Sequence, residues 1–162
     1  MNASDLCKYL GEKVSLPEFK DFLSQNSVEL PTELDLPEGE YNAYIERPDE
    51  GYSMVFTDEA VFLGNLSSGL ADGELFFSGV FLYSEGKDGY KQFEGIMPQG
   101  LNFNSLSKDF ISSFGKADWV RKRTDGSVAA ERWDNVTDYR IHITYDKTTG
   151  CPSVISLNKP DA

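Results

Sequence analysis

Few side chains in this sequence of 162 residues could carry out catalysis. His142 is the single histidine, and Cys7 and Cys151 are the two cysteines. A histidine acts as a general base only when an orienting acid and a nucleophile or substrate lie within hydrogen-bond reach. Nothing in the sequence assembles such a set around His142. We therefore expect His142 to be a surface or cross-strand histidine, both thiols to be free, and the protein not to be an enzyme.

Motifs for metals, cofactors and nucleic acids are also missing. The two cysteines are too far apart for a zinc knuckle, and the acidic strings at 49–52 and 72–75 lack the spacing of a calcium loop. The sequence has neither a Walker loop nor a GxGxxG motif. The basic run RKR (121–123) could contact phosphate, but a sequence pI near 4.4 opposes it, and a charged edge strand explains the run equally well. We expect no metal, no cofactor and no nucleic-acid partner.

The acidity of the chain is unevenly distributed. Residues 1–100 contain 19 acids and 6 bases, whereas residues 101–162 contain 8 acids and 9 bases. The densest stretch, 29–59, has ten acids and a single base, Arg47. A patch of one sign speeds association with partners of the opposite sign and repels nucleic acid and anionic lipid. The sequence therefore predicts a binding protein with a basic partner, although an acidic face that only promotes solubility is an equally simple interpretation.

Aromatic side chains are interspersed with these acids, as in many tight protein interfaces. We expect the acids to steer the encounter and the tyrosines to anchor it. The predicted partner-binding residues are Glu38, Glu40, Tyr41, Tyr44, Glu46, Asp49, Glu50, Tyr52, Asp58 and Glu59.

The elements that would position these residues follow from periodicity. Apolar stripes predict short helices at 4–10 and 16–25, and a third at 105–114 with Ser105 as its N-cap and Gly115 at its C-terminus. Alternation predicts a hairpin of 41–47 and 51–57, a central strand at 74–84 and a return strand at 90–95. Four further strands are expected at 118–123, 129–135, 138–146 and 151–157.

These elements predict an α+β fold with short N-terminal helices, antiparallel sheet and a helix before a C-terminal β-meander. We expect one domain, 1–162, with a helical part at 1–28, a first sheet region at 41–95 and the helix plus meander at 105–157. No segment approaches the roughly 20 apolar residues of a membrane span, and the N-terminus lacks the features of a secretory signal. A cytoplasmic protein without a membrane partner is therefore expected, while its oligomeric state is not predicted.

The C-terminal half, residues 90–157, resembles small bacterial immunity proteins that neutralise contact-dependent or type VI secreted toxins. Residues 51–60 are a further, upstream match. The chain departs from the pattern at Ala117, where a proline is usual. The positions that carry the resemblance are Met97–Pro98, Gly100–Leu101, Phe103, Phe114–Gly115, Trp133, His142–Tyr145 and Val154–Leu157.

The resemblance implies a non-catalytic protein whose partner is a cognate toxin, and the acidity favours a basic, nuclease-type toxin. It transfers no functional residue, because immunity proteins bind through surfaces that vary with the toxin. Two alternatives stay open: a structural or regulatory interaction domain, and a domain that binds a small ligand in a pocket lined by Phe76, Phe77, Phe81 and Tyr83.

Overall fold

The computed structural model describes residues 1–30, 34, 36–64 and 74–159 and shows an α+β fold built on one antiparallel sheet. No helix in these ranges is long and apolar enough to cross a membrane. The strands are β1 (Asn42–Arg47), β2 (Tyr52–Asp58), β3 (Leu75–Tyr83), β4 (Trp119–Lys122), β5 (Val128–Trp133), β6 (Arg140–Tyr145) and β7 (Pro152–Asn158). The α-helices are α1 (Ala3–Leu6), α2 (Pro17–Gln25), α3 (Glu59–Phe62) and α4 (Ser107–Phe114). Short 3₁₀ turns lie at η1 (Cys7–Tyr9), η2 (Pro48–Glu50), η4 (Lys87–Gly89) and η5 (Pro98–Gly100).

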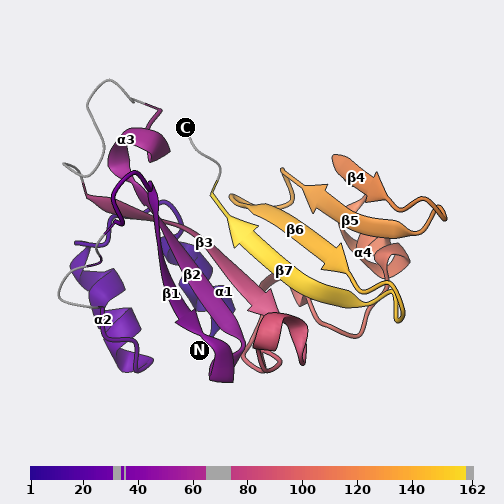
Figure 1. Ribbon diagram of the computed structural model, residues 1–162, viewed down its shortest axis with the longest axis horizontal. Helices are drawn as coiled ribbons and strands as arrows, with labels where there is room; N and C mark the ends of the chain where they lie inside the picture. The colour runs from indigo at the N-terminus through magenta and orange to yellow at the C-terminus, as the bar shows by residue number, and fades with distance from the viewer. Residues whose placement is uncertain (31–33, 35, 65–73, 160–162) are drawn as a thin grey trace.

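The seven strands follow the order β1-β2-β3-β7-β6-β5-β4, and every neighbouring pair is antiparallel. The chain forms β1 to β3, crosses over through α4, and returns as the meander β4 to β7 until β7 pairs with β3 (Figure 1). The two strand sets predicted from the sequence thus join at the β3–β7 pair into a single sheet.

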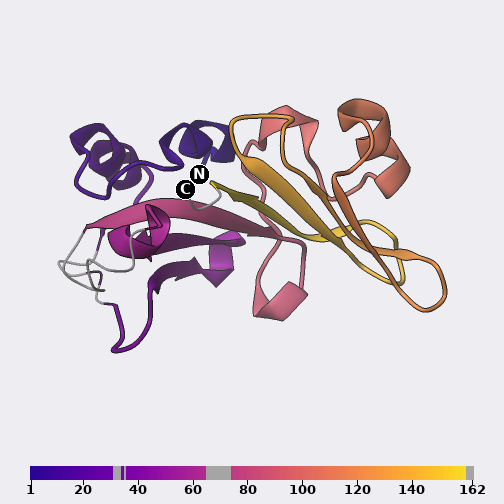
Figure 2. The same cartoon turned by 90° about the horizontal axis from the view of Figure 1, so that it is seen from above.

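Helices α1, α2 and α4 lie on the same side of this sheet (Figure 2). The core fills the space between them and the strands, where Phe19 of α2 stacks on Phe77 of β3 with ring centroids 5.2 Å apart. In the C-terminal half Trp133, Ile141, Ile143 and Ile155 are almost completely buried. Alternation of side chains along each strand sends the intervening residues to the opposite face.

The pairing of β2 with β3 is interrupted by a bulge in the middle of β3. The register of β2 against β3 shifts between Val55 and Phe56, so that Ser78 is the extra residue beside Gly79. A Cβ atom on Gly79 would lie 3.1 Å from Cβ of Asn158, because β7 approaches closely there. Gly79 therefore lies at a β-bulge and allows the close approach of β7.

Two local expectations are wrong. Residues 90–95 form no strand: Phe93 donates its N–H to the Tyr83 carbonyl and buries its ring, while β7 occupies the edge of β3. Helix α4 begins at Ser107 with Leu106 as its N-cap residue, not Ser105. The N–H of Ser105 instead donates to the side chain of Asn102, which turns the chain before the helix starts.

Candidate functional site

Most of the acids and tyrosines predicted to bind a partner are exposed along one edge of the sheet. They belong to β1, to the turn η2 and to the segment that precedes β1. Tyr41 and Tyr44 are the most exposed aromatic side chains in the described part of the chain, at 48% and 56% of their full accessible surface. The exposed members of the predicted set are Glu38, Glu40, Tyr41, Tyr44, Glu46, Asp49 and Glu50.

The remaining three predicted residues have structural roles. Tyr52 is completely buried, because β2 lies inside the sheet and the Tyr52 ring packs edge-on against Phe93. Asp58 is also buried and caps α3, where its Oδ1 accepts the N–H of Ala60 at 2.9 Å. Glu59 is half-buried and forms an ion pair with Lys13 at 3.9 Å. Tyr52 and Asp58 are therefore not available to a partner, contrary to expectation.

The face of the sheet opposite α1, α2 and α4 forms a second candidate site, which we call the open face. The strand register places one row of side chains across all seven strands on this face, since directly opposed residues of antiparallel strands share a face. The row runs Trp119, Arg132, His142, Ser156, Phe81, Ser53 and Glu46. Its β4–β6 end is cationic, whereas its β1 end carries a carboxylate.

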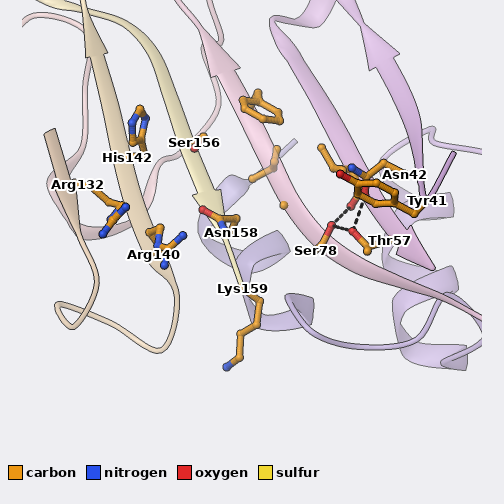
Figure 3. A pocket seen from close by; sticks show the side chains of 14 residues that line it. Tyr41, Asn42, Thr57, Ser78, Arg132, Arg140, His142, Ser156, Asn158 and Lys159 are labelled. Atoms are coloured by element: carbon orange, nitrogen blue, oxygen red, sulfur yellow. Dashed lines mark hydrogen bonds between the residues drawn. The ribbon is translucent and has the colours of Figure 1, made fainter. Parts of the chain in front are cut away.

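The open face contains a hollow of about 690 Å³ between these two ends. Arg132, Arg140 and His142 lie along one side of it, and Asn158 of β7 lies between them and the opposite wall (Figure 3). Phe81 and Val55 add apolar surface. A volume of this size is typical of sites for small molecules.

The wall opposite the cations is a short chain of hydrogen bonds. The Thr57 hydroxyl lies 2.8 Å from Oδ1 of Asn42 and 2.7 Å from Oγ of Ser78, and the Ser78 hydroxyl lies 3.2 Å from the carbonyl of Val55 (Figure 3). These bonds fix the polar groups of β1, β2 and β3 in place. Tyr41 borders the same wall, so one of the predicted aromatic residues does line the hollow.

The two arginines beside the hollow share one carboxylate. Nε of Arg140 lies 2.8 Å and Nε of Arg132 lies 3.0 Å from Oδ1 of Asp134, just beyond the end of β5. The guanidinium carbon of Arg132 also lies 5.8 Å from the centroid of the Trp119 ring, a cation–π distance. Two guanidinium groups against one carboxylate leave a net positive charge at this end of the hollow.

These surroundings disfavour the charged form of His142. Its ring is partly buried, and Trp119 stacks on it with centroids 5.8 Å apart. Burial lowers the pKa of His142 below its ordinary value, and the positive charges of Arg132, Arg140 and Arg121 lower that pKa further. The imidazole is thus harder to protonate than an ordinary histidine side chain.

Sequence patterns predict one part of this cluster but not the other. Arg140, His142 and Thr144 alternate with buried residues along β6, a pattern that can be read from the sequence of the expected strand at 138–146. It gave no indication that Arg132 of β5 lies directly opposite His142, because strand pairing depends on register. The basic run RKR is at the edge strand β4, where Arg121 and Lys122 are exposed.

Potential metal ligands do not converge in the described residues: no three His, Cys, Asp or Glu side chains there are grouped as a metal site would require. Cys7 and Cys151 are free thiols.

Comparison with known proteins gives one distant structural neighbour. No protein-family model matches the chain, and no curated protein sequence is similar to it. A solved structure of a DUF4309 family protein from Bacillus subtilis can be superposed over 91% of this chain and 78% of its own, with 9% sequence identity and a TM-score of 0.43.

Proposed function

We propose that this protein is a non-catalytic binding protein that holds a basic partner protein at the β1 edge of its sheet. The observation that carries the proposal is the exposure of Tyr41 and Tyr44 among carboxylates on an edge strand. Edge strands present unpaired backbone groups to a partner, and exposed tyrosines supply buried contact area once the partner is bound. The tyrosines therefore provide contact area, and the carboxylates around them provide charge.

The charges of this edge favour a cationic partner. Glu46, Asp49 and Glu50 lie within five consecutive positions at the β1–β2 turn, and the whole chain carries a net charge of −12. Opposite charges on a partner would raise the association rate, and this steering weakens as salt is added. A nuclease is a suitable partner, since its active site is built to bind phosphate and would accept carboxylates in its place.

The specific form that we propose is a cytoplasmic immunity protein that neutralises such a toxin. It rests on the resemblance of residues 90–157 to immunity proteins and on the acidic edge, and it requires no reaction on this chain. A regulatory interaction domain would use the same edge, but its partner would not be lethal.

The test has two parts. The product of the neighbouring gene is expressed alone to measure its toxicity, and it is then co-expressed with this protein to test rescue and co-purification. We expect a basic product that is lethal alone, is retained by this protein, and is rendered harmless by it. The triple variant Glu46→Lys/Asp49→Lys/Glu50→Lys should slow association and flatten its salt dependence.

The matched control makes the same change of charge elsewhere. Glu12, Glu18 and Asp21 are exposed in the N-terminal helical region, outside β1 and η2, and their replacement by lysine should leave most of the association rate intact. Equal slowing by both triple variants would show that total charge matters and the β1 edge does not. A neighbouring product that is neither retained nor toxic would contradict the immunity proposal.

A further inference from the structure

The open face has a hollow whose charge differs from that of the rest of the molecule. The chain is strongly acidic, yet the positive groups Arg132 and Arg140 meet at one end of a hollow large enough for a small molecule. Clustering like charges costs free energy unless an opposite charge compensates them. Here the single carboxylate of Asp134 compensates one of the two.

The arginines retain donors that can reach a ligand. Nε of Arg140 is held by Asp134, whereas neither of its Nη atoms donates a hydrogen bond to another described residue. Arg132 is held by one Nη bond of 3.3 Å to Asp134, and its buried Nε lies 3.0 Å from the same carboxylate, so its second Nη, which donates no hydrogen bond to a described residue, is the group left for a ligand. The forked guanidinium matches the two oxygens of a carboxylate or phosphate.

The rest of the hollow suits the body of an organic molecule. Phe81 and Val55 provide apolar contact, and the fixed hydroxyls of Thr57 and Ser78 provide polar contact at the far wall. Ser156 lies directly between His142 and Phe81 in the strand register, so the cationic and apolar parts adjoin.

We propose that this hollow binds a small organic anion, whose carboxylate or phosphate group is held by Arg140 and Arg132 beside His142 and whose body lies on Phe81 and Val55. The ligand is small because the net charge of −12 repels a polyanion, while one anionic group gains the local attraction of the arginines. This site adjoins the β1 edge at Tyr41, but its anion-binding groups are Arg132 and Arg140 at the other end of the hollow, so either proposal can fail without the other.

The experiment is an NMR titration of the whole protein with benzoate and with phenyl phosphate, at constant ionic strength. Benzamide, the neutral isostere of benzoate, is the matched control ligand. We expect saturable shifts of the arginine Nε–H and Trp119 indole signals with at least one anion, and none with benzamide. Arg140→Gln should weaken that binding about tenfold or more, the loss typical of charge-assisted hydrogen bonds.

Lys108→Gln removes the same charge from exposed α4, on the other side of the sheet, and should leave the affinity unchanged. A second measurement needs no variant: His142 is the single histidine, so its ring signals report its titration directly. The anion should raise the pKa of His142, because a nearby negative charge favours the imidazolium.

Three results would overturn the proposal. They are the absence of saturable shifts with both anions, equal weakening by Arg140→Gln and Lys108→Gln, and a His142 titration that is unchanged at saturating anion. Tighter binding of a short oligothymidylate than of either small anion would also overturn it, in favour of a nucleic-acid surface.

Discussion

Arg132 and His142 lie directly opposite each other on β5 and β6, on the face of the sheet that α1, α2 and α4 leave uncovered. This pairing puts a permanent positive charge beside a group that titrates near neutral pH. Asp134 partly neutralises Arg132, and the lowered pKa of His142 disfavours a second positive charge there.

We predict that His142 makes the protein less stable as the pH falls below the ordinary histidine pKa of 6.5. Burial and the charges of Arg121 on β4, Arg132 on β5 and Arg140 on β6 lower the pKa of the folded state, and Ser156 on β7 adds no charge. Between the two pKa values the unfolded chain binds more protons than the folded chain, so protonation favours unfolding. The melting temperature, measured from pH 7.5 to 5.5, should fall more steeply for the wild type than for His142→Gln. Identical pH profiles of the two proteins would contradict this account.

Glu131 provides a second prediction. Its carboxylate is almost fully buried, and Oε1 accepts hydrogen bonds from the Tyr145 hydroxyl at 2.9 Å and the Ser107 hydroxyl at 2.6 Å. Tyr145→Phe leaves this buried charge with one donor fewer, which should lower the free energy of unfolding by about 1.5–3 kcal/mol. Urea denaturation measures the loss. Tyr44→Phe, at an exposed position, is the control and should change stability by less than about 0.5 kcal/mol.

The strands were predictable because alternation is a local property. The strand expected at 138–146 is β6, and its buried residues Ile141 and Ile143 are those that the alternation selects. The hairpin of β1 and β2 was predictable for a similar reason, since Gly51 adopts a positive φ at the turn between them.

Features that depend on distant contacts were not predictable. The residues around Tyr52 resemble those around the exposed Tyr44. However, the ring of Tyr52 is covered by Phe93, which lies about forty residues later in the chain. The cationic end of the hollow likewise requires the register of β5 against β6, which brings Arg132 to His142. Strand order and register decide both, and neither is encoded in a single segment.

Gly51 should tolerate alanine poorly. It has a φ of +81°, and a Cβ atom there would clash with the backbone N of Phe93 and the carbonyl oxygen of Lys91. Two costs should lower the free energy of unfolding of Gly51→Ala. They are left-handed backbone strain of about 1–2 kcal/mol and a packing clash of about 1–3 kcal/mol. The matched control is Gly126→Ala, because Gly126 has a φ of +86° and open space around it. Urea denaturation should therefore show a clearly larger loss for Gly51→Ala, and equal losses would mean that the contact with Phe93 is unimportant.

The two cysteines should differ sharply in reactivity. Burial raises the pKa of Cys7 to about 12, so almost no thiolate forms there at neutral pH, whereas Cys151 is partly exposed in the turn before β7. Thiolate and access to solvent both control reaction with a disulfide reagent. Titration of the native protein with such a reagent should modify Cys151 quickly and Cys7 only on unfolding in urea. The variant Cys151→Ser should abolish the fast phase and Cys7→Ser should preserve it. A fast phase that survives in Cys151→Ser would show that α1 and η1 open readily enough to expose Cys7, and would contradict their close packing in the core.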